Sequence, residues 1–106
     1  MDADQIRLLA RREVAAVLRR ERRTWIHTLR EEFATYYALA NLTRWLGRDP
    51  FIQIGRHATV NLHAIEHIIH YGDRLYRVRL CDRVGTEIKV PRTGAAQLAA
   101  VFKTQR

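Results

Sequence analysis

The stretch FIQIGRHATVNLHAIEHIIHY, residues 51–71, decides the fold class of this sequence. Its apolar residues form short runs rich in β-branched and aromatic side chains, and glycine or polar residues separate these runs. Runs of this length and composition are typical of β-strands. We therefore expect a short strand over 51–54 that ends at Gly55, another over Thr59–Leu62, and a longer one over Ile65–Tyr71.

Toward the C-terminus, the segment Leu75–Leu80 alternates between apolar residues and arginines. Successive side chains of a strand point to opposite faces, so this alternation predicts a strand with one buried face. Thr86–Val90 alternates in the same way, and Asp82–Gly85 supplies a turn between the two runs, which together predict a β-hairpin. Pro91 ends the hairpin because proline has no N–H to donate to a strand ladder.

Two short helices are expected beside these strands. Apolar residues recur at helical spacing within Ala38–Leu46, and Gly47 and Pro50 just after it are stop signals. At the C-terminus, Thr93 is placed to cap a final helix that runs through Phe102.

The N-terminal third is less regular. On spacing and propensity, Asp4–Arg23 fits an amphipathic helix, with apolar residues set among arginines and alanines. Trp25–Leu29 and Phe33–Tyr37 are short and rich in aromatic or β-branched residues, and Glu31 and Glu32 lie at a turn between them. This arrangement predicts a second hairpin.

The chain is strongly basic. Its 106 residues suit one domain with one hydrophobic core. Lys and Arg number 19 against 11 Asp and Glu, a net charge of +8, and all of these cations except Lys89 and Lys103 are arginine. A guanidinium is a rigid fork of donors that suits phosphate oxygens and guanine edges, so the surplus favours a nucleic-acid partner. A solvated basic surface without a partner explains the composition equally well.

The sequence lacks the signatures of several other classes. Cys81 is the sole cysteine, which excludes an internal disulfide and a cysteine-pair metal site. No stretch approaches the roughly 20 apolar residues that span a bilayer, and the N-terminus has no signal core, so we expect a soluble cytoplasmic protein. Without a phosphate-binding glycine loop, a zinc-protease motif or a nucleophile elbow, we expect no enzyme activity, no cofactor and no small-molecule substrate.

The histidines raise the question of a metal site. His63, His67 and His70 have the spacing of ligands on one helix face. If Ile65–Tyr71 is a strand, His70 has the opposite parity from the other two, and no cysteine or carboxylate completes a tetrahedral set. We therefore expect no metal.

The aromatic residues keep a second function open. Interleaved with arginines, they could stack the bases of a single strand, as in a small basic β protein that binds RNA or the ribosome. The pattern instead places Trp45 and Phe51 in the core and leaves Trp25 or Tyr37 as candidates for exposure. A protein-interaction module partnered with a membrane or receiver component is a third alternative.

Three segments resemble one family. Residues 51–68 are similar to the LytTR signature F-x-R-I-H-R-S-x-x-V-N-L-x-x-I, and Thr86–Arg92 resembles the family's G-T-x-I-x-V-S-R ending. Ile26–Thr28, with the leucines of Ala38–Leu46, resembles its I-H-T and S-L-x-x-L segment. The resemblance spans about 5–102, and its specificity comes from several pieces at the right distances rather than from any one motif.

The resemblance implies a mainly β fold of antiparallel strands in small stacked sheets with one or two short helices, and no helix-turn-helix. It also implies that Ile6–Ala10 is a strand and that Glu13–Leu18 is at most a short helical turn, against the local helical pattern. Gly55, His57 and Pro91 depart from the family, which usually has His, Ser and Ser there, so the base preference does not carry over in detail.

In function, the resemblance implies the DNA-binding output domain of a bacterial two-component response regulator that controls transcription. In this family, three loops on one edge of the sheets enter successive major grooves of double-stranded DNA. The matching positions in this chain carry Arg22, Arg23, Arg56 and Arg92. Further DNA contacts are expected at Arg20, His57, Arg77 and Lys89.

These expectations extend to partners. Because one domain on one half-site binds modestly, direct-repeat promoter sites or a homodimer on DNA are expected. A receiver or membrane regulatory partner is a further possibility under the resemblance. Asn61 is expected to close a turn through its side chain rather than to contact DNA.

Overall fold

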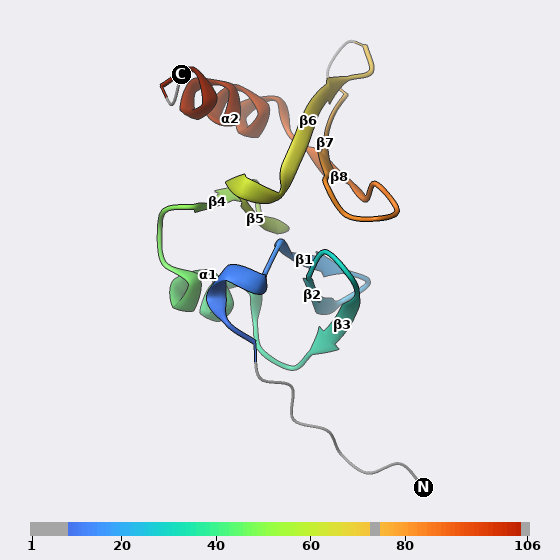
Figure 1. Cartoon of the computed structure of the whole chain (residues 1–106), viewed down its shortest axis with the longest axis vertical. Coiled ribbons are helices and arrows are strands. Elements are labelled where there is room, and N and C mark those ends of the chain that lie inside the picture. Colours follow the sequence, from blue (N-terminus) through green and yellow to red (C-terminus); the bar gives the residue numbers. More distant parts are fainter. Residues whose placement is uncertain (1–8, 73–74, 105–106) are drawn as a thin grey trace, which may run out of the picture.

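A computed structural model describes residues 9–72 and 75–104, and over these residues the chain forms two antiparallel sheets and two α-helices (Figure 1). The first sheet has five strands in the order β3-β2-β1-β5-β4. Its strands are β1 (Ala16–Arg20), β2 (Arg23–His27), β3 (Glu32–Thr35), β4 (Phe51–Ile54) and β5 (Ala58–Asn61). The two expected hairpin strands of the N-terminal third and both short strands after Pro50 are confirmed.

The second sheet has three strands in the order β6-β7-β8. These are β6 (Ile65–His70), β7 (Tyr76–Leu80) and β8 (Glu87–Val90). In the β7–β8 hairpin Val78 lies opposite Ile88, and both are buried, whereas Arg77 lies opposite Lys89 on the other face. The predicted hairpin and its buried face are confirmed, because the alternation of apolar and charged residues fixes the register.

The helices are α1 (Leu39–Leu46) and α2 (Arg92–Thr104). The first was predicted within one residue: its leucines face the core, and it ends at Gly47, which has a φ of 79°. The second begins at Arg92, because the Pro91 carbonyl already accepts the Ala95 N–H. The expectation that Thr93 caps this helix is therefore wrong, since Thr93 lies inside the first turn. The two helices are separated by five strands, so they form no helix-turn-helix.

The five-stranded sheet lies between two cores. On one face α1 packs against it through Leu39, Leu42 and Leu46. On the other face lie the three-stranded sheet and α2, whose Leu98 is fully buried with Val78 and Leu80.

The N-terminal segment differs from both expectations. The helical turn is the 3₁₀ segment η1 (Arg11–Glu13), and the chain from Ala16 onward is β1, so neither the long helix nor a turn over Glu13–Leu18 is correct. The reason is burial: residues 14–17 are all buried, Val14 and Val17 in one core and Ala15 and Ala16 in the other. Such a run has no period-2 signature and resembles a buried helix. The expected strand at Ile6–Ala10 lies largely outside the described residues.

Candidate nucleic-acid interface

Strand pairing brings two arginine-bearing turns to one end of the five-stranded sheet. Strand β1 is antiparallel to both β2 and β5, so the end of β1 lies at the start of β5, where Leu18 pairs with Ala58. Just beyond that pair, the Arg19 N–H donates a hydrogen bond to the His57 carbonyl at 2.8 Å. The β1–β2 turn and the β4–β5 turn are therefore neighbours.

The β1–β2 turn presents Arg22 and Arg23. Arg20 pairs with Arg23, which leaves Glu21 and Arg22 as a two-residue turn with φ values of 54° and 66°. Two successive positive φ values define the type I′ turn of tight hairpins, in which Asn and Gly are the favoured residues. Neither residue here is of that kind, so the turn carries backbone strain, of the sort that often accompanies a functional site. Both arginines are exposed.

The β4–β5 turn presents Arg56 and His57, both exposed. Gly55 begins this turn with a φ of 70°, and a Cβ there would lie 3.2 Å from the Cγ of Pro91. Glycine therefore serves both the backbone conformation and the close approach of the proline ring. Two of the departures from the family pattern, Gly55 and Pro91, are thus in contact with each other.

That contact places α2 beside the same turns. Arg92 follows Pro91 directly and is exposed as the first residue of α2. Gly94, two residues further, lies against Ile54 of β4, so the start of the helix is fixed to the end of that strand. We call this end of the sheet, with Arg22, Arg23, Arg56 and Arg92, the arginine end. Within the described residues none of these four side chains makes an ion pair or a hydrogen bond, so their donors are available.

The remaining predicted contacts lie elsewhere or are already engaged. Arg20 pairs with Glu32 at 3.2 Å and lies over the Trp25 ring at 4.7 Å. Arg77 is half-buried and Lys89 exposed, opposite each other on the outer face of the three-stranded sheet. Both lie toward the end at which β8 leads into α2, beside the arginine end rather than in it.

The β3–α1 connection carries two exposed tyrosines; the sequence named Tyr37 as a candidate for exposure and gave no sign of Tyr36. Tyr36 is fully exposed and Tyr37 has 66% of its surface exposed, next to the β1–β2 turn. Trp45 was expected in the core but is 55% exposed, because the leucines of α1 fill the inner face of the helix. The expected burial of Phe51 is confirmed. Two aromatic residues directly after a strand and before a helix were the available signal.

At the opposite end of the sheet, polar groups are used internally. Asn61 is buried; its amide donates to the Val14 carbonyl at 3.0 Å and its side-chain oxygen accepts the His63 N–H at 2.9 Å. The predicted turn-closing role of Asn61 is confirmed.

His27 is also buried near this end. Its Nε2 lies 2.9 Å from Oε2 of Glu32, without the alignment of a hydrogen bond. Burial lowers the pKa of His27 below its ordinary 6.5; Arg20 adds to this, and the carboxylates of Glu32 and Asp82 oppose it.

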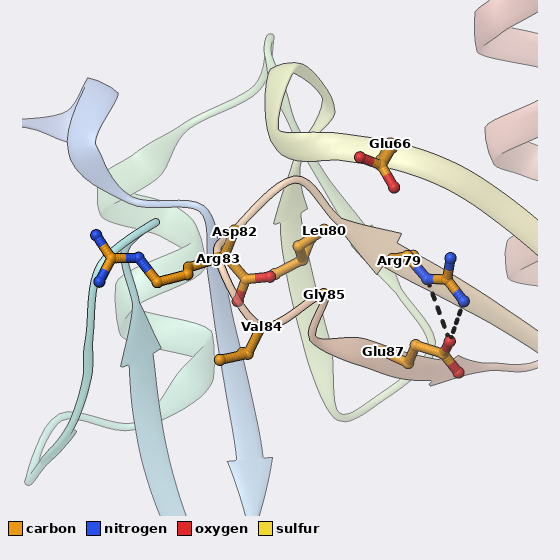
Figure 2. A pocket seen from close by; sticks show the side chains of 8 residues that line it. All are labelled: Glu66, Arg79, Leu80, Asp82, Arg83, Val84, Gly85 and Glu87. Carbon is orange, nitrogen blue, oxygen red and sulfur yellow. Dashed lines mark hydrogen bonds and ion pairs between the residues drawn. The ribbon is translucent and has the colours of Figure 1, made fainter.

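A polar hollow of about 500 Å³ lies beside the β7–β8 turn (Figure 2). Arg79 donates to Glu87 at 2.8 Å across it, and this bond, with one from Tyr71, lowers the pKa of Glu87. Arg83 extends away from this pair in Figure 2. Asp82 in turn accepts the Thr86 N–H at 2.7 Å, so both Glu87 and Asp82 are occupied by partners of their own. Among the described residues, no three His, Cys, Asp or Glu side chains are arranged to hold a metal ion.

Fold and site together define a small basic β domain that presents arginines on inter-strand turns. The sequence matches the family model of the LytTr DNA-binding domain over residues 4–103, and the chain belongs to that family. The predicted mainly β fold is confirmed. The family is one of DNA-binding domains rather than of enzymes. No helix in the described part of the chain is long and apolar enough to cross a membrane.

One similar solved structure is the LytTr DNA-binding domain of a protein from Bacillus cereus, described as a methyl-accepting/DNA response regulator. It superposes with a TM-score of 0.73 at 17% sequence identity, over 89% of this chain and 84% of that one. At this identity the likeness establishes the fold. No curated protein matches the sequence significantly.

Proposed function

We propose that this domain binds double-stranded DNA sequence-specifically, as the DNA-reading part of a transcriptional regulator. The observation that carries the proposal is the arginine end, where three separate segments present exposed guanidinium groups with no partners among the described residues. Family membership supplies DNA as the ligand. The arginine end is the surface that would contact the DNA.

Base reading falls to the two turns and the start of α2. A guanidinium bonds both O6 and N7 of guanine in the major groove, and each such pair gives about 1–3 kcal/mol of discrimination. Arg56 is the best placed, because its turn is held by the Gly55–Pro91 contact and by the backbone bond from Arg19. A rigid turn fixes the direction of the guanidinium group. Base reading requires a fixed direction, whereas phosphate binding does not.

Phosphate contacts are assigned to the flanking polar side chains. Arg77 and Lys89 lie on the neighbouring outer sheet face, and His57 lies beside Arg56. Such contacts set register and affinity without reading sequence. Arg20 contributes mainly its charge, because Glu32 and Trp25 already hold its guanidinium.

The wider setting is proposed from the same resemblance. The similar Bacillus cereus domain comes from a protein described as a response regulator, which suggests a receiver or membrane component upstream of this domain. One domain offers a short reading surface, so direct-repeat sites or a homodimer on DNA would supply the missing affinity.

Selection of duplexes from a random pool tests the proposal. Wild-type protein should enrich one motif, Arg56→Ala and Arg92→Ala should each relax one or two positions of it, and Arg77→Ala should weaken all sequences alike. Arg30→Ala is the matched control, because Arg30 is also an exposed turn arginine but lies at the opposite end of the sheet. Affinity should fall with salt, with a slope of about 0.9 per neutralised phosphate. Equal losses for Arg30 and Arg56 variants would contradict base reading, and preference for single strands would favour an RNA-binding function.

A further inference from the structure

A cleft of about 450 Å³ opens beside the β1–β2 turn and extends from that turn to the connection between β3 and α1, which lies outside the predicted base-reading segments. Strand β3 pairs antiparallel with β2, Thr24 opposite Thr35, so the segment after β3 emerges next to the start of β2. The cleft is lined on one side by Arg19, Arg22 and Arg23 and on the other by Tyr36 and Tyr37.

The exposure of the two tyrosines has no explanation in the packing of the fold. Tyr36 is fully exposed and Tyr37 is 66% exposed, whereas Leu39 and Leu42, which follow them, already fill the core beneath α1. The segment is nevertheless fixed, because the Tyr37 N–H donates to Oγ1 of Thr35 at 3.3 Å and Leu39 is buried. Two large rings are thus held in water beside three cations.

The chemistry of this cleft suits a phosphodiester. Guanidinium groups supply charge and paired donors for phosphate oxygens, and a phenol O–H supplies one more donor. An aromatic face offers an apolar surface to a deoxyribose. Glu21 is the acidic side chain of the adjoining turn, and the three arginines outnumber it.

We propose that this cleft binds a backbone phosphate and sugar of the DNA duplex, at the edge of the site farthest from Arg92. This inference rests on the proposed function. The sheet order places the cleft at β3 and β2, followed by the β1–β2 turn, the β4–β5 turn and α2. Tyr36 and Tyr37 therefore extend the footprint by one flanking contact on the β3 side and add no base preference.

A double-substitution cycle on the full chain tests the inference. The protein variant is Y36F with Y37F, which removes the hydroxyls and keeps the rings. The DNA variants are selected duplexes in which a single phosphate is replaced by a neutral methylphosphonate, scanned along each flank. W45F is the control, because Trp45 is also an exposed aromatic residue but lies on α1 outside the cleft.

Loss of a hydrogen bond to a charged group should weaken duplex binding by about tenfold in the double variant. One methylphosphonate position, on one flank, should weaken the wild type by a similar factor and the double variant hardly at all, with the enriched motif unchanged. W45F should bind as wild type does.

Three results would overturn the inference. If the double variant keeps full affinity while Arg56→Ala still relaxes the motif, the cleft is no contact and the proposed function stands. If the wild type enriches no duplex motif, both the proposed function and this inference are wrong. If the tyrosines affect single-strand binding alone, the cleft stacks bases instead.

Discussion

The two ends of the five-stranded sheet use their polar residues in different ways. At the opposite end, Arg11 donates to the carbonyl of Leu46, the last residue of α1, and to that of Asp49 just after the helix, and Asn61 bonds two backbone segments. At the arginine end, the corresponding side chains make no such bonds among the described residues. One end stabilises the fold, and the other is left with donors for a ligand. Sequence composition does not distinguish the two, because both contain arginines in turns.

The largest effect on stability should come from Asn61→Ala at the opposite end. The substitution removes two hydrogen bonds and leaves the Val14 carbonyl and the His63 N–H without their partner. Unpaired buried groups of this kind should lower the free energy of unfolding by about 2–4 kcal/mol. Denaturant unfolding measures this. A loss below that of an exposed control, Asn41→Ala, would mean that the opposite end is not held by its polar contacts.

Arg11→Ala compares an arginine that holds the fold with one that reads DNA. Arg11 bonds two carbonyls and lies over the Phe51 ring at 4.9 Å, so its loss should cost about 1–2 kcal/mol of unfolding free energy. Arg56→Ala should leave stability within about 0.5 kcal/mol, as exposed positions usually do. Thermal denaturation of both variants checks the contrast. Similar losses of stability in the two variants would mean that Arg11 does not stabilise the fold more than Arg56 does.

His27 makes the opposite end sensitive to acid. The pKa of His27 is lowered by burial, so the unfolded chain binds its proton more readily than the folded one. Stability should therefore fall as the pH drops below 6.5, toward the lowered pKa of the folded state, by at most about 1.4 kcal/mol per pH unit. Denaturant unfolding between pH 7.5 and 5 should show less of this decline in His27→Gln. An unchanged slope would assign the acid sensitivity to other groups.

A modest gain in stability is expected at the strained turn of the arginine end. Glu21 has a φ of 54°, which glycine adopts without strain, so Glu21→Gly should raise the free energy of unfolding by up to about 1 kcal/mol. DNA selection should return the same motif, because Arg22 and Arg23 remain. A loss of stability would show that the turn is not strained by its residue types.

The β7–β8 hairpin and α1 could be predicted because each buries one face. Its apolar residues therefore recur in the sequence at the period of a strand or a helix. Strand β1 could not be predicted, because both of its faces are covered and its apolar run is continuous. Thr93 was misassigned as a cap because the register of α2 depends on the Pro91 carbonyl, a tertiary detail.

The candidate site was predictable in its residues but not in its geometry. Resemblance to the family singled out Arg22, Arg56 and Arg92, yet only strand pairing and the Gly55–Pro91 contact place them at one end. Tyr37 was named only as a candidate for exposure and Tyr36 was missed, because exposure of an aromatic residue depends on what else fills the core. In α1 the leucines already do so.

Backbone amide chemical shifts during titration with a selected duplex test the central assignment most directly. The account predicts that perturbations concentrate at Arg19–Arg23, Gly55–His57 and Arg92–Gly94, all at the arginine end. Perturbations centred on Thr28–Arg30 and Asn61–His63 instead would place the DNA at the opposite end and contradict it.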